Sequence, residues 1–210
     1  MKTKYHIEIT HNALHKHFSS KALRTIIKAN IHQDRIKYQF NHEYIHFDSN
    51  AFKKGFEYIA LNEKIILDNV KLREYAIARK ALGRVTHSWQ DFYSHSNFVN
   101  LWLEKATSSS PEDINFDDYE ILSSPNLQSG KNYGIIEFFA LIPGISKIVI
   151  PLMPEDSHAK MNLDSPASGP NFPFAYWAAF MRTLEFYERI LFKLDEHDIA
   201  SDQIRAFHDK

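Results

Sequence analysis

The segment from about Lys71 to about Tyr93 carries a long helical pattern of apolar residues, and this pattern most limits the possible folds. Apolar side chains recur there every three or four positions, at Leu72, Tyr75, Ala76, Leu82, Val85, Trp89 and Phe92. An α-helix places residues at this spacing on one face. The pattern therefore predicts one long helix with a buried face.

The rest of the chain repeats this helical pattern in shorter segments. Further helices are predicted at about residues 9–18, 21–27, 52–60, 174–194 and 199–207. Only the short run Ile148-Val149-Ile150 favours a strand. A section at about 107–132 is rich in Ser, Asp and Asn, which is typical of a loop. With 210 residues, the chain is predicted to form a single compact all-α domain over residues 1–210.

Charge and cysteine content exclude several classes of protein. The chain has no Cys, which excludes disulfide scaffolds and thiolate metal sites. Its 25 Lys and Arg against 26 Asp and Glu give a net charge of -1. Because no overall positive field attracts phosphate groups, a nucleic acid is a less favoured partner.

The chain also lacks the sequence signals of membrane insertion. Its most apolar stretch, Tyr133 to Met153, is interrupted by Glu137, Lys147 and Pro151, and its apolar runs are far shorter than the ~20 residues that cross a bilayer. No apolar run follows the lysines at the N-terminus, so no secretory signal is predicted. The expected location as encoded is cytoplasmic, with export by a signal-independent route as the alternative.

Histidine and aspartate mark the candidate site. The chain has 12 His, and His87, Asp91 and His95 follow one another at steps of four. On a helix these side chains lie on one face, at a distance that allows chelation of one ion. Imidazole and carboxylate without sulfur suit Zn²⁺. The alternative interpretation is a hydrogen-bonded polar face without a metal.

Other imidazoles and carboxylates fall at predicted helix ends or faces. These residues are His6, Asp34, His46, Asp48, His158 and Asp164. Several helices could direct such side chains into one cleft.

Four motifs in chain order resemble a known superfamily. They are His6-x-x-Ile9-Thr10-x-x-Ala13-Leu14, Gln33-Asp34, His46-Phe47-Asp48 and Leu82-Gly83-Arg84-x-x-His87-x-x-Gln90-Asp91-Phe92-Tyr93-Ser94-His95-Ser96-Asn97. Together they resemble the heterokaryon-incompatibility C branch of the zinc-dependent phospholipase C and single-strand nuclease superfamily, over roughly residues 5 to 190. The resemblance implies a mostly helical fold with three zinc ions in one cleft that cleaves phosphate esters.

The resemblance also implies a ligand set of eight residues. One zinc would be bound by Asp34, His46, His87 and Asp91. Asp91 would bridge to a second zinc that has His6 as its imidazole ligand. The third zinc would be bound by His95, His158 and Asp164. Gln90, Asp48 and Asn97 are candidates for supporting the zinc-bound imidazoles by hydrogen bonds.

The predicted function is a zinc-dependent hydrolase of phosphate esters, most similar to phospholipase C, with two or three zinc ions. Asp34 and Asp91 are the expected catalytic residues, through activation of a water between paired metals. The expected partner is a phosphate-ester substrate, for example a phospholipid at a membrane surface. Two alternatives stay open: a single-strand nuclease, and a metal-stabilised interaction protein of the heterokaryon-incompatibility type without turnover. The sequence predicts no oligomeric state.

Overall fold

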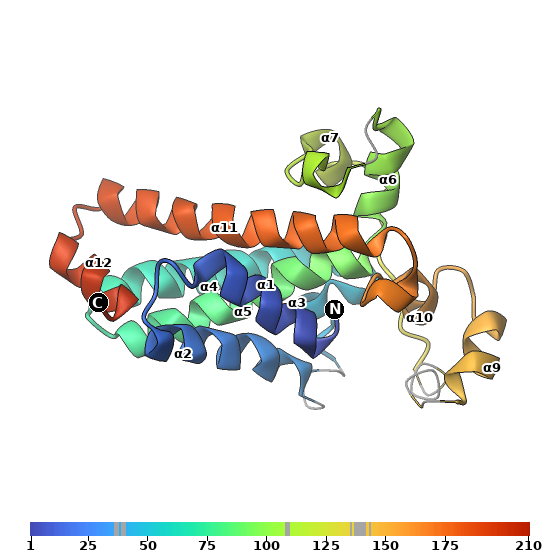
Figure 1. Cartoon of the computed structure of the whole chain (residues 1–210), viewed down its shortest axis with the longest axis horizontal. Helices are drawn as coiled ribbons and strands as arrows, with labels where there is room; N and C mark the ends of the chain where they lie inside the picture. The colour runs from blue at the N-terminus through green and yellow to red at the C-terminus, as the bar shows by residue number, and fades with distance from the viewer. Residues whose placement is uncertain (36–37, 39–40, 108–109, 135, 137–141, 143) are drawn as a thin grey trace.

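The structure, a computed structural model, describes residues 1–35, 38, 41–107, 110–134, 136, 142 and 144–210. Helices make up the regular structure of these residues, and no strand occurs among them. The predicted all-α class is therefore confirmed. Figure 1 shows the long helices lying side by side, with α6, α7, α9 and α10 toward one end of them and α12 at the other.

The helices are α1 (Thr3–Leu14), α2 (Ser20–Ile31), α3 (Glu43–His46), α4 (Phe52–Lys71), α5 (Tyr75–His95), α6 (Phe98–Lys105), α7 (Tyr119–Leu122), α9 (Ser146–Leu152), α10 (His158–Met161), α11 (Phe172–Glu196) and α12 (Ser201–His208). Short 3₁₀ helices are η1 (His32–Asp34), η3 (Asp48–Asn50), η4 (Pro111–Asp113) and η5 (Pro166–Ser168). Among the described helices, none is both long enough and apolar enough to cross a membrane.

Helix α5 is the centre of the bundle. It packs against α2, α4 and α11, and every residue from Val85 to His95 is buried. That buried stretch includes polar side chains such as His87, Gln90 and Asp91. Since a buried polar group needs a partner to offset its lost hydration, this half of α5 requires complementary polar groups from its neighbours.

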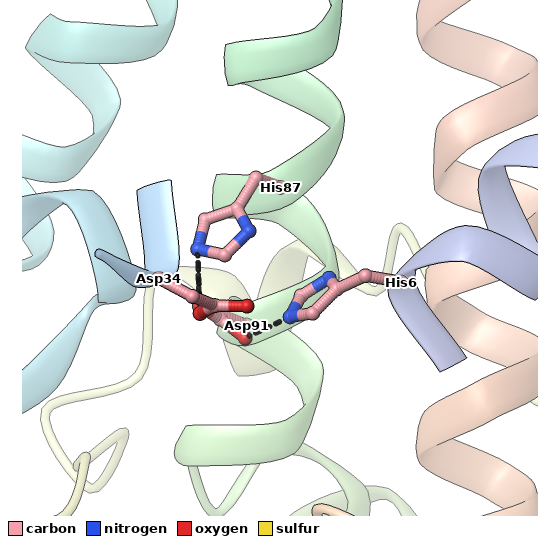
Figure 2. Close-up of side chains that lie close together, drawn as sticks. All are labelled: His6, Asp34, His87 and Asp91. Carbon is pink, nitrogen blue, oxygen red and sulfur yellow. Dashed lines mark ion pairs between the residues drawn. The ribbon is translucent and has the colours of Figure 1, made fainter. Parts of the chain in front are cut away.

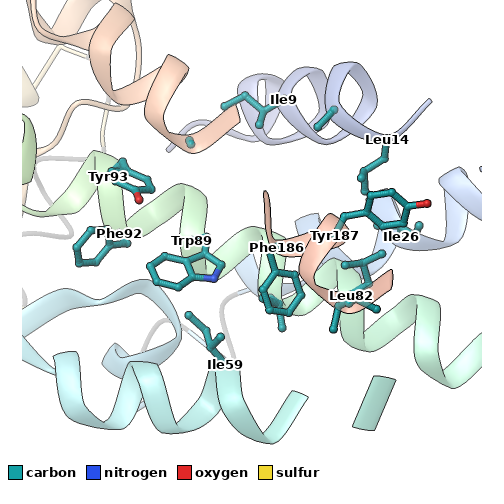
Figure 3. Close-up of a cluster of buried hydrophobic side chains, with 14 of the residues drawn as sticks. Ile9, Leu14, Ile26, Ile59, Leu82, Trp89, Phe92, Tyr93, Phe186 and Tyr187 are labelled. Atoms are coloured by element: carbon teal, nitrogen blue, oxygen red, sulfur yellow. The ribbon is translucent and has the colours of Figure 1, made fainter. Parts of the chain in front are cut away.

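Aromatic packing fixes the other face of the same half of α5. The Phe92 ring centroid lies 5.2 Å from that of Phe47 and 5.7 Å from that of Trp89. Figure 3 shows Trp89, Phe92 and Tyr93 on α5, with Ile59 of α4 near Trp89. These contacts limit rotation of α5 and so determine where its polar face points.

Gly83 allows α2 and α5 to approach closely. A Cβ atom at Gly83 would overlap the backbone carbonyl of Ile26 and would lie 2.8 Å from the Cβ of Ala29. The absence of a side chain therefore brings Asn30 of α2 within hydrogen-bonding reach of α5.

We expect Gly83→Ala to destabilise the protein by about 2 kcal/mol overall, because overpacking against rigid backbone at this distance should cost about 3 kcal/mol, the upper end of its usual range. This cost outweighs the gain of about 1 kcal/mol that Ala brings to a helix interior. Urea unfolding measures the difference, and Lys80→Ala, at an exposed position of α5, is the control. A more stable Gly83→Ala variant would show that the helices can separate without cost.

Two sequence-based predictions of local structure are wrong. Helix α1 begins at Thr3, so His6 lies on this helix and not before it. The buried face of α1 consists of His6, Ile9, Thr10, Ala13 and Leu14, and its two polar members concealed the pattern. The strand-favouring run Ile148–Ile150 lies within α9, and no described strand is present to pair with it.

The loop-rich section at about 107–132 contains η4 and α7 and is attached to the bundle by Arg182 of α11. The Arg182 guanidinium is buried, donates to the carbonyl of Phe116 and pairs with Asp117. It also lies 4.5 Å from the Trp89 ring centroid. The section is therefore anchored to α5 and α11.

Candidate metal centre

His87, Asp91 and His95 lie on one face of α5, as their spacing predicts. The His87 Nε2 atom is 2.9 Å from Asp91 Oδ2, and the His95 Nε2 atom is 3.7 Å from Asp91 Oδ1. All three residues are buried. Asp91 is thus the middle of a row of three possible ligands.

A first group of possible ligands forms where α1 and η1 meet α5. It consists of His6, Asp34, His87 and Asp91, whose ligand atoms all lie within 4.8 Å of one another. Figure 2 shows the four side chains converging, with His6 Nε2 3.1 Å from Asp91 and His87 Nε2 3.7 Å from Asp34. Nitrogen and oxygen ligands from four side chains in so small a volume can bind a metal ion.

A second group lies at the carboxyl end of α5. It consists of Asp48, His95 and His158, and their ligand atoms also lie within 4.8 Å of one another. Asp48 Oδ1 is 2.9 Å from His95 Nδ1 and 3.4 Å from His158 Nε2. Sequence reasoning gave Asp48 only a supporting role, whereas its position makes it the carboxylate of this group.

Asp164 and His46 lie beside these groups. Asp164 Oδ1 is 3.3 Å from His95 Nε2 and 2.9 Å from the Met1 amine, which in turn lies 2.6 Å from Asp91. The His46 Nδ1 atom is 2.8 Å from Asp91 Oδ2. The structure therefore brings all eight predicted ligand residues together at the carboxyl-terminal half of α5, and their role as metal ligands stays a prediction.

The backbone at Gly130 connects the segments that carry the second group. The Gly130 N–H donates to the His95 carbonyl, and the Ser49 N–H donates to the Gly130 carbonyl, at 3.0 and 2.8 Å. A Cβ atom at Gly130 would lie only 2.5 Å from the Cα atom of His158. Glycine therefore lets η3, α5 and α10 meet at one point.

The carboxylates of the site stay ionised in spite of their burial. Burial works to raise the pKa of Asp91, but the Met1 amine, His87 and His95 outweigh it and hold this pKa well below its ordinary value. Burial also works to raise the pKa of Asp48, but His158 and His95 outweigh it, so that this pKa is lowered overall. The carboxylates are therefore in the ionised form that can bind a cation.

Two imidazoles on α5 respond to this environment in opposite ways. Burial lowers the pKa of His87 to about 4, in spite of the neighbouring Asp91. Burial and the Met1 amine also act to lower the pKa of His95, but Asp91 and Asp48 outweigh them and raise it to about 10. His87 is therefore neutral near pH 7, the form that binds metals.

Two buried imidazole nitrogens support a metal at this place. The Nε2 atoms of His6 and His46 have no hydrogen-bond partner, although leaving a buried polar atom unsatisfied costs about 1–3 kcal/mol. The side chains of Asp34, His158 and Asp164 are 27%, 24% and 28% exposed, so the site has an edge that solvent reaches. The donor set fits a divalent metal ion.

Comparisons with known proteins point away from the predicted superfamily. Proteins of rat and mouse described as von Willebrand factor A domain-containing protein 7 are each 37% identical over 90 residues, which is 40% of this chain and 10% of theirs. The human protein of that description is 35% identical over 82 residues. The chain thus spans about a tenth of the length of these relatives. No solved structure shows a significant match.

The predicted membership of the zinc-dependent phospholipase C and nuclease superfamily is therefore wrong. The predicted phosphate-ester hydrolase is wrong as well, and neither the relatives nor the matching family supports its two alternatives. The resemblance depended on four short motifs that contain His and Asp, and helices with a polar face can present these residues at the same spacing. The family model that matches is described as the VWA7 N-terminal domain and covers residues 3–114, just over half of the 210 residues. The chain belongs to the VWA7 N-terminal domain family.

Proposed function

We propose that this domain binds divalent transition-metal ions, with zinc preferred, in two neighbouring positions beside Asp91. The observation that carries the proposal is that two His and Asp groups lie together along α5. Beside them, the buried Nε2 atoms of His6 and His46 lack hydrogen-bond partners. The names of the relatives state no metal, so the support comes from the geometry of this chain.

The first position would use His6, Asp34, His87 and Asp91. Two imidazoles and two carboxylates match the four-ligand tetrahedral sites that zinc prefers, and the absence of sulfur disfavours copper(I) and iron–sulfur clusters. A bound zinc ion would supply the positive charge that the carboxylates attract. All four residues lie within the part of the chain that the family model matches.

The second position would use Asp48, His95 and His158. It offers three protein ligands, so we expect it to bind zinc more weakly than the first position. His95 must lose its proton before it binds a metal, and Asp91 and Asp48 hold its pKa at about 10 against burial and the Met1 amine. Binding at this position therefore releases a proton.

Zinc titration of the metal-free protein tests the proposal. We expect uptake of about two equivalents by elemental analysis after gel filtration, because folded sites retain ions that unfolded chains release. His87→Ala removes the stronger site, and Asp48→Asn removes only the weaker one. His197→Ala, at an exposed position after α11, is the matched control and keeps both. Uptake below about one equivalent by the wild-type protein would overturn the proposal.

A further inference from the structure

A layer of buried polar side chains lies behind the first group. It joins α1, α2, α5 and α11, and all of its members are inaccessible to solvent. The members are Thr10, Asn30, Thr86, Gln90 and Thr183. Polar groups buried this deeply are costly unless their hydrogen bonds are complete. The donor and the acceptor of each hydrogen bond can therefore be assigned in turn.

The first chain of hydrogen bonds begins at Thr183 of α11. Its hydroxyl donates to the carbonyl of Ala179, 2.8 Å away, and thereby uses its only proton. Toward Gln90 it can only accept, and the Gln90 Nε2 atom lies 3.3 Å from it. The amide of Gln90 is therefore fixed with its nitrogen toward Thr183 and its Oε1 atom in the opposite direction.

The second chain begins at Thr86 of α5 in the same manner. Its hydroxyl donates to the carbonyl of Gly83 at 2.9 Å, and it accepts from Asn30 Nδ2 at 3.0 Å. The amide of Asn30 is therefore oriented with its oxygen toward His87. A bond of 3.0 Å from Asn30 Nδ2 to Gln90 Oε1 connects the two chains.

Both amide oxygens face the Nδ1 atom of an imidazole. Gln90 Oε1 lies 2.6 Å from His6 Nδ1, and Asn30 Oδ1 lies 3.4 Å from His87 Nδ1. An amide oxygen has no proton to give, so each Nδ1 atom must carry one. In a neutral imidazole the lone pair is then on Nε2.

Both Nε2 atoms lie close to the carboxylate of Asp91. His6 Nε2 and His87 Nε2 lie 3.1 and 2.9 Å from the oxygens of Asp91. Two acceptors that face each other without a proton between them repel, whereas a cation between them attracts both. The hydrogen-bond chains therefore prepare the site for a metal.

We propose that Thr183 with Gln90, and Thr86 with Asn30, are positioning residues that hold His6 and His87 in the Nδ1–H tautomer required for metal binding through Nε2. This inference rests on the metal binding proposed above. Partners of this kind typically change metal affinity by about 10- to 100-fold when they are removed.

The test is nitrogen NMR of the histidine side chains in the zinc-free protein at about pH 8.5, about two units above the ordinary imidazole pKa. We expect wild-type His6 and His87 to be protonated at Nδ1 and unprotonated at Nε2. Thr183→Val should give a mixture of tautomers mainly at His6, and Thr86→Val mainly at His87. A smaller change is expected at the other imidazole, because the bond from Asn30 Nδ2 to Gln90 Oε1 connects the two chains. Thr183→Ser and Thr86→Ser keep the hydroxyl and should restore the wild-type spectra. Zinc affinity should fall about 10- to 100-fold in the Val variants and recover in the Ser variants.

The outcomes separate this inference from the proposed function. A wild-type spectrum with Nε2 protonated at both residues overturns the inference without any variant, and so do Val variants whose tautomers do not change. If the wild-type protein shows the expected tautomers but takes up no zinc, the hydrogen-bond assignment is supported and the metal proposal is overturned.

Discussion

Asp91→Asn is expected to weaken zinc binding at the first group by at least about 100-fold, more than the loss of a supporting hydrogen bond causes. Asp91 provides the carboxylate that lies within 3.1 Å of both His6 and His87. An amide of the same size removes the negative charge and turns a donor toward one of the imidazoles. Competition with a chromophoric chelator measures the change in affinity.

The matched control is Asp68→Asn, which makes the same substitution on α4. Asp68 is 52% exposed and pairs only with Lys64 in the described contacts, one turn earlier, so zinc affinity should not change. Wild-type affinity in the Asp91→Asn variant would show that the ion binds elsewhere on the chain.

The long central helix could be predicted from sequence, because the spacing of its apolar residues is a local property. The residue at which this helix begins could not be predicted in this way. The predicted helix began near Lys71, where the structure ends α4, and α5 begins at Tyr75. The turn between them contains neither Gly nor Pro, and Arg73 adopts a left-handed conformation with φ of 63°. Backbone hydrogen bonds to the end of α4, such as Glu74 N–H to Asn69 carbonyl, stabilise this unusual turn.

Local sequence spacing likewise predicts one part of the candidate site and not the rest. His87, Asp91 and His95 are found by counting along one helix, since residues four apart share a face. The role of Asp48 depends on contacts between segments far apart in sequence, such as Ser49 with Gly130, and no local pattern reveals them. Asn30 was also missed, although a polar residue on the buried face of α2 is the signal that could have revealed it.

The misleading family resemblance has a physical explanation. One of its motifs ends with Asp91 to Asn97, which form the end of α5 and the turn after it, where polar side chains such as Asp91 and His95 are buried. A match over residues 3–114 samples α1 to α6, including the apolar contacts between them. The family model therefore draws on many positions along these helices, whereas the resemblance depended on a few short motifs.

Zinc is expected to raise the melting temperature of the metal-free protein by about 10 °C at a free concentration 1,000-fold above its Kd. An ion that binds only the folded state then contributes about 4 kcal/mol, and about 2–4 °C accompanies each kcal/mol in a chain of about this size. The ligands of the first group come from α1, η1 and α5, so one ion connects segments that separate on unfolding. Calorimetry with and without zinc measures the shift, and excess chelator should reverse it.

The Asp91→Asn variant distinguishes this stabilisation from unspecific binding to the 12 histidines of the chain. Ions that bind the unfolded chain reduce the shift, because only the difference in affinity between the two states counts. The variant retains all 12 histidines but lacks the central carboxylate. With affinity weakened about 100-fold, the same zinc concentration contributes about 1.4 kcal/mol, so its melting temperature should rise by at most about 3–6 °C. Equal shifts in the wild-type and variant proteins would mean that the stabilising zinc binds outside the first group. No shift in the wild-type protein, although zinc is taken up, would mean that the folded and unfolded chains bind it equally well.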